Sequence, residues 1–220
     1  MLNETYDLNK LSELMGILLG DGCLSKTGKA HYIYISGHKI DDFEYHNTIT
    51  RSLFLNLFDK KININFRKNE KTLFIRFSDK NIFYFLNKQG LPVGRKYESI
   101  KVPELCKHKN QYFFSFIRGL FDTDGCIVFT KQHKSVYYYP RLELTSKSKN
   151  FLLEILSFLI KIGFYGSISN KGKRCYRLEI SGFNNLNLWI KLIGFNNPKI
   201  IKKMASRAGI EPATLRLTAS

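Results

Sequence analysis

The sequence predicts an α+β protein in which one unit of helix, two strands, helix, two strands and helix (αββαββα) occurs twice. Two observations carry this prediction. Residues 14–22 and 117–125 both run small and apolar and both end in Asp-Gly, at matching places in the two halves of the 220-residue chain. Each segment is followed by the same order of alternating and helically spaced apolar residues. Such a repeat at a long interval indicates a duplicated structural unit.

The first half opens with a helix that Asp7 or Asn9 would cap and that runs to Gly20. Its residues are apolar on most sides, which predicts that the helix is buried. Strands are then expected where apolar and polar residues alternate, and helices where apolar residues recur every three to four positions. These elements are strands at 23–25 and 31–35, a helix over 41–57, strands at 62–67 and 73–77, and a helix over 80–89.

The second half predicts the same order. Its elements after the motif helix are strands at 126–129 and 138–145, a helix over 149–162, strands at 165–169 and 174–180, and a helix over 184–193. We therefore divide the chain into halves at 1–100 and 111–203, joined by a linker at 101–110. Residues 204–220 do not continue the repeat, and we expect them to form a disordered tail.

The two repeated acids, Asp21 and Asp124, lie where a helix should end. A carboxylate in the last turn faces the negative end of the helix dipole, where Lys or Arg is preferred. An Asp-Gly turn in which the aspartate bonds its own backbone would explain one copy. Recurrence in matching contexts favours a second explanation, in which both acids bind a cation.

Gly16 and Gly119 occupy the same place in the two motif segments. A glycine inside a helix costs about 1 kcal/mol relative to alanine, and simple tolerance of that cost is one explanation. We expect instead that the missing side chains let the two motif helices pack closely together.

The chain carries 35 Lys and Arg against 18 Asp and Glu, a formal net charge of +17. This surplus favours a polyanionic partner such as nucleic acid, although ribosomal and membrane-surface proteins are also this basic. No apolar run reaches the roughly 18 residues of a membrane span, and residues 1–10 lack the order of a signal peptide. The four cysteines form no close pair, which indicates a reducing compartment. We expect no membrane partner and no secretion, but a place in the cytoplasm or nucleoid of a prokaryote or in an organelle matrix.

The predicted hairpins offer a polar face to such a partner. Asn63, Asn65 and Arg67 alternate with Ile62, Ile64 and Phe66, so one set faces outward and the other packs underneath. Half-exposed antiparallel sheets alternate in this way in general, but the basic residues around them favour contact with DNA bases and phosphates. The candidate DNA-binding residues are Asn63, Asn65, Arg67, Lys68, Lys71, Arg76, Lys131, Lys134, Lys147, Lys171, Lys173, Arg174 and Arg177.

Taken together, the two Asp-Gly segments and the repeated element order resemble the two-motif, monomeric LAGLIDADG homing endonucleases over residues 8–203. The second copy matches the family nonapeptide well and includes Asp122 and Asp124. The first copy departs from it at Leu19 and Gly20, where the family often has Asp and Ala.

The resemblance implies two saddle-shaped antiparallel sheets related by a pseudo-twofold axis through the motif helices. It implies an intron-encoded hydrolase that binds double-stranded DNA as a monomer with an internal pseudo-dimer and cuts a long asymmetric site across the minor groove. Asp21 and Asp124 would hold Mg²⁺, with Mn²⁺ as an alternative ion, and each would serve one strand. Lys96 and Lys199 match basic positions near the cut phosphate, where they would offset developing charge; plain backbone contact is the alternative.

One departure bears on the chemistry. Relatives often carry a polar, water-ordering residue after the second strand of a half, where this chain has Ser36-Gly37 in the first half and Ser146-Lys147 in the second. Gly37 has no side chain for that task, so we expect uneven cutting of the two strands. Two further functions remain open: an intron RNA-splicing maturase, with intron RNA as partner, and a non-cleaving DNA-binding regulator of the same fold.

Overall fold

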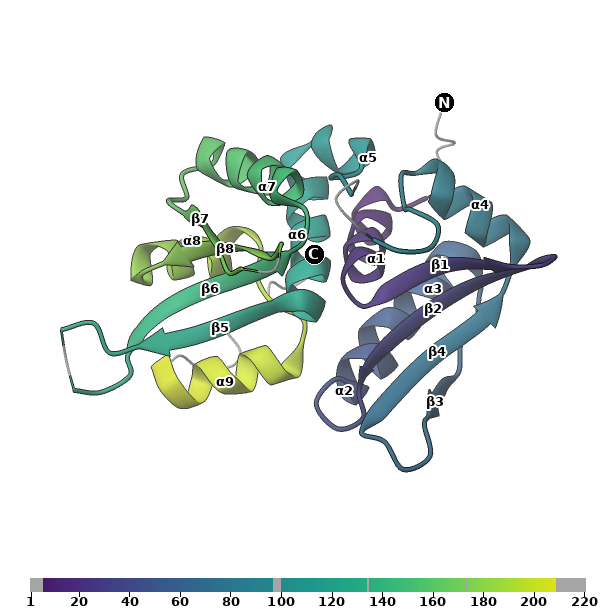
Figure 1. The fold of residues 1–220 in the computed structure, drawn as a ribbon, viewed down its shortest axis with the longest axis horizontal. Coiled ribbons are helices and arrows are strands. Elements are labelled where there is room, and N and C mark those ends of the chain that lie inside the picture. The colour runs from purple at the N-terminus through teal and green to yellow at the C-terminus, as the bar shows by residue number, and fades with distance from the viewer. Residues whose placement is uncertain (1–5, 97–99, 134, 173, 209–220) are drawn as a thin grey trace. The chain divides into compact units, whose positions relative to one another are not determined.

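The computed structural model describes residues 6–96, 100–133, 135–172 and 174–208 (Figure 1). By their contacts these residues form two compact units. Unit 1 holds the residues up to Lys96 together with Pro103–Thr123, and unit 2 holds the residues from Asp124 onward together with a short stretch before Pro103.

Unit 1 contains one four-stranded antiparallel sheet in the order β1-β2-β4-β3. Its elements are α1 (Leu8–Gly20), β1 (Gly22–Thr27), β2 (Ala30–His38), α2 (Phe43–Tyr45), the π-helix η1 (His46–Thr50), α3 (Arg51–Phe58), β3 (Ile64–Phe66), β4 (Thr72–Ser78), α4 (Lys80–Lys88), α5 (Glu104–Lys107) and α6 (Asn110–Asp124), the last up to Thr123.

Unit 2 repeats this sheet in the order β5-β6-β8-β7. Its elements are β5 (Gly125–Thr130), β6 (Tyr139–Ser146), α7 (Lys149–Lys161), β7 (Ser167–Asn170), β8 (Tyr176–Ser181), α8 (Phe183–Leu192) and α9 (Pro198–Ala208). The predicted α+β fold with a duplicated αββαββα unit is confirmed by this equal strand order.

The register of the two sheets identifies equivalent residues. Gly22 pairs with Ile35 in the first sheet, and Gly125 pairs with Leu144 in the second. Gly37 is therefore equivalent to Ser146, two residues further along each strand. The helix-covered face of each sheet carries buried apolar side chains, including the equivalent pair Ile35 and Leu144, and in the first sheet also the buried His31.

Helix α1 is buried over nearly its whole length, as its apolar sequence predicted. It packs against α6 inside unit 1 at the two motif glycines. A Cβ on Gly16 would meet the carbonyl oxygen of Phe116 and lie 2.7 Å from the backbone nitrogen of Leu120. A Cβ on Gly119 would meet the carbonyl oxygen of Glu13. The two backbones therefore approach more closely than any larger residue allows.

The structure differs from the sequence-based expectations in several places. The segment 41–57 is not one α-helix but α2, η1 and α3 in succession. Phe66 does not pack underneath the sheet: it is 46% exposed at the edge strand β3 and lies beside the ring of Phe43. Part of the predicted linker is helical, because α5 and the first residue of α6 fall within 101–110.

The predicted disordered tail begins too early. Helix α9 continues to Ala208, and Met204 is fully buried together with Ile200 and Ile201. The spacing of these three residues gives α9 an apolar stripe that covers unit 2. Residues 209–220 of the predicted tail lie outside the described part of the chain. Over the described residues, no helix combines the length and apolar character required to cross a membrane.

Candidate functional site

Asp21, the first candidate acid, caps the carboxyl end of α1. Its N–H donates to the carbonyl oxygen of Ile17 over 3.0 Å, and its own carbonyl oxygen accepts from the N–H of Ser36 in β2 over 3.1 Å. These bonds fix the residue between helix and sheet. The side chain is 22% exposed, so the carboxylate is partly sheltered but reachable from solvent.

Lys96 reaches the same helix end from a distant part of the sequence. Its ammonium group donates to the carbonyl oxygens of Leu19 and Gly20 over 2.7 and 2.6 Å. Helix α1 has no basic residue in its own last turn. Lys96 therefore supplies the positive charge that a helix carboxyl end favours, directly before Asp21.

His46 is a site residue that the sequence analysis missed. Its ring is fully buried, and its Nε2 lies 3.9 Å from Oδ2 of Asp21. Burial lowers the pKa of His46 to about 4, so the imidazole is neutral at physiological pH. The sequence held one sign of this residue: His46 is a single histidine among the apolar positions of the segment after Asp42. Such a histidine is more often a hydrogen-bonded core residue than a functional one.

An ion pair joins the motif helices beside the glycine contact. The guanidinium group of Arg118 donates to both carboxylate oxygens of Glu13, over 3.2 and 2.7 Å.

The two acids of the second motif differ in exposure. Asp122 of the second motif is 2% exposed. Because Asp122 is buried while Asp124 is exposed, Asp124 is the acid of this motif that solvent can reach.

In unit 2, Asp124 is the last residue of α6 and directly precedes β5. Lys199 is exposed in the first turn of α9, where its backbone N–H donates to the side chain of Asn197 over 3.0 Å. The structure thus places Lys96 at the end of a motif helix and Lys199 at the start of a different helix.

Each sheet has one face covered by helices and an opposite face, which we call the open face. The open face of the first sheet combines aromatic rings with arginine. The guanidinium group of Arg76 lies 4.1 Å from the ring centre of Tyr32. The rings of Tyr34 and Phe74 stack at 6.2 Å, and Arg67 donates to the Tyr34 hydroxyl over 3.3 Å. Planar rings and guanidinium groups of this kind suit contacts with bases and phosphates.

Four charged residues cover the open face of the second sheet. Arg141 lies 3.5 Å from Glu143 and 3.4 Å from Glu179, Arg177 lies 3.1 Å from Glu143, and Arg177 also pairs with Glu179. All four side chains are at most 25% exposed. Arg177, predicted to bind DNA, is thus already engaged in an ion-pair network that the sequence analysis did not foresee.

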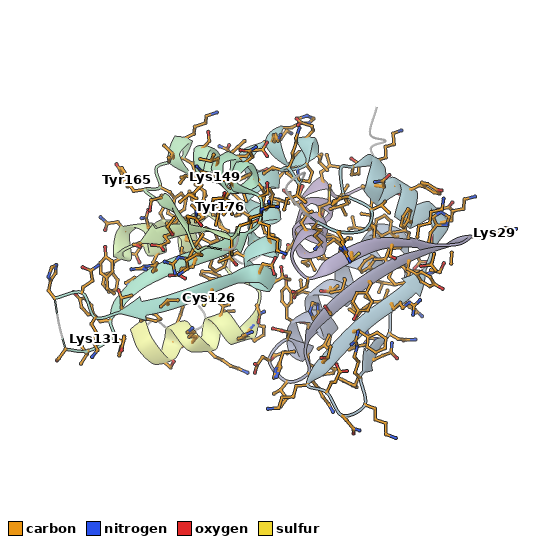
Figure 2. The ribbon with its side chains drawn as sticks, in the orientation of Figure 1. Lys29, Cys126, Lys131, Lys149, Tyr165 and Tyr176 are labelled. Carbon is orange, nitrogen blue, oxygen red and sulfur yellow. The ribbon has the colours of Figure 1, made fainter. Side chains whose placement is uncertain are left out.

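The other predicted DNA-binding residues lie on the surface. Exposed side chains are those of Asn63, Asn65, Arg67, Lys68, Lys71, Arg76, Lys131, Lys147, Lys171 and Arg174. Figure 2 shows Lys29 at the tip of the β1–β2 hairpin and Lys131 in the loop that follows β5, so each sheet carries a basic loop at one end. Lys134 and Lys173 lie outside the described residues.

The donor chemistry at the end of α1 is that of a single accessible carboxylate beside backbone oxygens. Mg²⁺ takes one or two protein carboxylates and completes its shell with water and phosphate oxygens, so Asp21 fits such an ion. Asp124 presents the same chemistry in unit 2. Across the described ranges, no group of three or more His, Cys, Asp or Glu side chains could hold a metal ion by itself.

Residues 112–194 match the family model of the LAGLIDADG-like domain. The chain is 26% identical over 197 residues to the ribonucleoside-diphosphate reductase NrdEB subunit alpha of Bacillus subtilis (strain 168). That match covers 81% of this chain but 17% of the relative, so the chain spans less than a fifth of the relative's length.

Two solved structures share the fold at low sequence identity. The homing endonuclease I-DmoI in complex with DNA and Mn is 20% identical with a TM-score of 0.60, over 85% of this chain and 97% of that one. The N-terminal LAGLIDADG domain of DUF199/WhiA is 16% identical with a TM-score of 0.57, over 88% and 87%. Two differently named proteins with this fold show that activity must be argued from the site and not from the fold.

Proposed function

We propose that this chain, which matches the LAGLIDADG-like domain model over residues 112–194 and shares the fold of I-DmoI, is a site-specific DNA endonuclease, a phosphodiester hydrolase. In this proposal it acts as a monomer, because one chain supplies both motifs, and it cuts both strands of a long asymmetric duplex across the minor groove. The reaction depends on a divalent metal ion, Mg²⁺ or Mn²⁺. An intron-encoded origin is part of the same proposal.

The single observation that carries the proposal is the repeated placement of an accessible acid at the end of a motif helix. Asp21 ends α1 and Asp124 ends α6, both against the preference of the helix dipole. A bare carboxylate repels phosphate, so neither acid by itself would favour DNA binding. A bound metal ion would reverse that sign at both places.

Each carboxylate would hold a metal ion near one strand. When bound, such an ion activates water and stabilises the leaving 3′ oxygen. Lys96 would hold the carboxyl end of α1 in place through its two carbonyl contacts and add positive charge close to the phosphate. Asp21 itself would be oriented by its bonds to Ile17 and Ser36.

The sheet faces and their basic loops would bind the duplex. A net charge of +17 attracts the phosphate backbone without regard to sequence, while Tyr34, Arg76 and their neighbours would contact base edges. The similar fold of I-DmoI, a structure solved in complex with DNA and Mn, supports double-stranded DNA and a divalent ion as the first ligands to test.

The test uses a library of randomised DNA duplexes, since the target is unknown. The purified full chain is incubated with the library and Mg²⁺, and cut ends are captured and sequenced. We expect one long asymmetric sequence cut on both strands, and no cutting when EDTA removes the metal. Tight binding of a selected duplex without cutting would support a regulator instead, and tight binding to intron RNA without DNA cutting would support a maturase.

A further inference from the structure

We propose that His46 is a positioning residue for Asp21: its Nε2–H donates to carboxylate oxygen Oδ2 and so directs the other carboxylate oxygen toward the metal ion. The inference deepens the proposed function and, in its metal-related part, rests on it. The contact itself is a property of the protein without metal or DNA.

The geometry of the imidazole points to this role. His46 begins η1, a π-helical turn closed by the N–H of Arg51 on the carbonyl oxygen of His46. Single π-helical turns are frequent at functional sites. The ring is fully buried, and its Nε2 has no hydrogen-bond partner among the described residues, while Oδ2 of Asp21 lies 3.9 Å away.

The opposite ring nitrogen determines which atom carries the proton. His46 Nδ1 lies 3.0 Å from the hydroxyl of Thr50, itself fully buried. If the hydroxyl donates to Nδ1, the proton of the neutral ring is on Nε2. A buried donor without an acceptor costs about 1–3 kcal/mol, and a carboxylate is the strongest acceptor available. A movement of about 1 Å by the Asp21 side chain closes the gap to hydrogen-bond length.

Gly37 makes room for this ring. A Cβ on Gly37 would lie 2.9 Å from His46 Nε2, so a side chain there and the ring in its present place exclude each other. The space beside the glycine is thus filled by an imidazole from another element, η1.

The second half has different residues at the two equivalent positions. By register Gly37 is equivalent to Ser146, and counting from the helix caps Asp42 and Ser148 makes His46 equivalent to Leu152. Leu152 is fully buried and cannot donate a hydrogen bond. The proposed positioning contact is thus a feature of the first half. There the polar side chain, His46, comes from η1, whereas in the second half the polar side chain at this place, Ser146, comes from the strand β6.

The direct test measures the free protein by long-range proton–nitrogen NMR correlation of its histidine rings. We expect His46 to carry its proton on Nε2, and the Nε2 signal to move in Asp21→Asn but not in Asp124→Asn. A His46 protonated on Nδ1, or a signal unchanged by Asp21→Asn, would overturn the inference. A role in packing alone would not produce this pattern.

A second experiment measures the rate at which each strand of the selected duplex is cut. His46→Leu should slow metal-dependent cutting of one strand about 10- to 100-fold, the usual cost of losing a partner behind a metal ligand. His46→Gln, whose amide can donate from nearly the same place, should restore most of the rate. His31→Leu is the matched control, because His31 is also buried but bonds to Tyr84.

The two proposals fail separately. If wild-type protein cuts no duplex, the proposed function fails, and the NMR measurement still decides whether His46 bonds to Asp21. If wild-type protein cuts and His46→Leu cuts both strands at wild-type rates while remaining folded, the inference about His46 fails alone.

Discussion

The two sheets have the same strand order and the same apolar side, yet their open faces differ position by position. Tyr34 and Arg76 face each other in the first sheet, where the second sheet has Glu143 and Glu179. The first face is aromatic and cationic, whereas the second balances its charges internally. The two halves therefore share the apolar side that the core requires and differ on their open faces, which suits the proposed contact with two unlike half-sites.

The sites at the motif-helix ends differ in a similar way. Both halves keep the acid, but only one of the two equivalent helix positions, His46 against Leu152, carries a polar ring. In the proposed function the acids are thus the chemistry that both halves share, and the residues around them differ between the halves.

Removing either shared acid should have the largest effect. Asp21→Asn and Asp124→Asn should each reduce double-strand cutting by at least about 1000-fold, because each removes a metal-binding charge worth several kcal/mol. Duplex binding should be retained, since neither carboxylate attracts phosphate. Single-turnover cutting and fluorescence anisotropy measure the two quantities. Undiminished cutting by either variant would place the metal elsewhere.

The glycine contact should be equally sensitive from both sides. Gly16→Ala and Gly119→Ala each force a Cβ against the backbone of the opposite motif helix. Each should lower the free energy of unfolding by about 3 kcal/mol, measured in urea, because two buried backbones must separate. Asn184→Ala, on the exposed side of α8, is the control and should change it by less than about 0.5 kcal/mol. An unchanged Gly16→Ala protein would contradict the close approach.

Acid should destabilise the protein through His46. Burial lowers the His46 pKa from 6.5 to about 4, so the unfolded chain binds this proton more tightly than the folded protein. The contribution of the neutral ring to stability is complete above about pH 6.5 and is lost as the pH falls toward 4, by up to about 3 kcal/mol. Urea unfolding from pH 7 to 4 should show a shallower loss in His46→Leu. Parallel curves for the two proteins would argue against a buried neutral His46.

The sheet faces should respond oppositely to loss of an arginine. Arg76→Ala should weaken duplex binding about tenfold, with little change in the free energy of unfolding. The slope of log binding constant against log salt concentration should become less steep by about one. Arg177→Ala should instead cost about 2 kcal/mol of stability, because Glu143 and Glu179 lose a partly buried partner. Anisotropy across salt concentrations and urea unfolding separate these effects. If both variants weakened duplex binding equally, the open face of the second sheet would also contact DNA, contrary to this prediction.

Much of the fold could be predicted because local patterns and tertiary structure agree. Alternation in residues 62–67 and 73–77 located a hairpin, although β3 proved shorter at Ile64–Phe66. The motif helices followed from apolar runs and their closing Asp-Gly. Met204 was missed although its spacing from Ile200 and Ile201 is helical, because the residues after it resemble no part of the repeat.

The site could be predicted less completely, because its remaining parts depend on tertiary contacts. Neither the π-helical turn nor the pairing of His46 with Gly37 has a local sequence signal, since the two residues meet through packing of a helix on a strand. Likewise, Glu143 and Glu179 look like ordinary outward-facing strand residues until the register places them beside Arg141 and Arg177.

The most direct test of the account is metal binding by the DNA complex. Mn²⁺ is titrated by calorimetry into the selected duplex bound to wild-type protein, Asp21→Asn and Asp124→Asn, with His31→Leu as control. If each half supplies one acid for the metal, both aspartate variants will bind Mn²⁺ more weakly than wild type, and the control will match it. Wild-type binding by either aspartate variant would contradict the assignment of that acid.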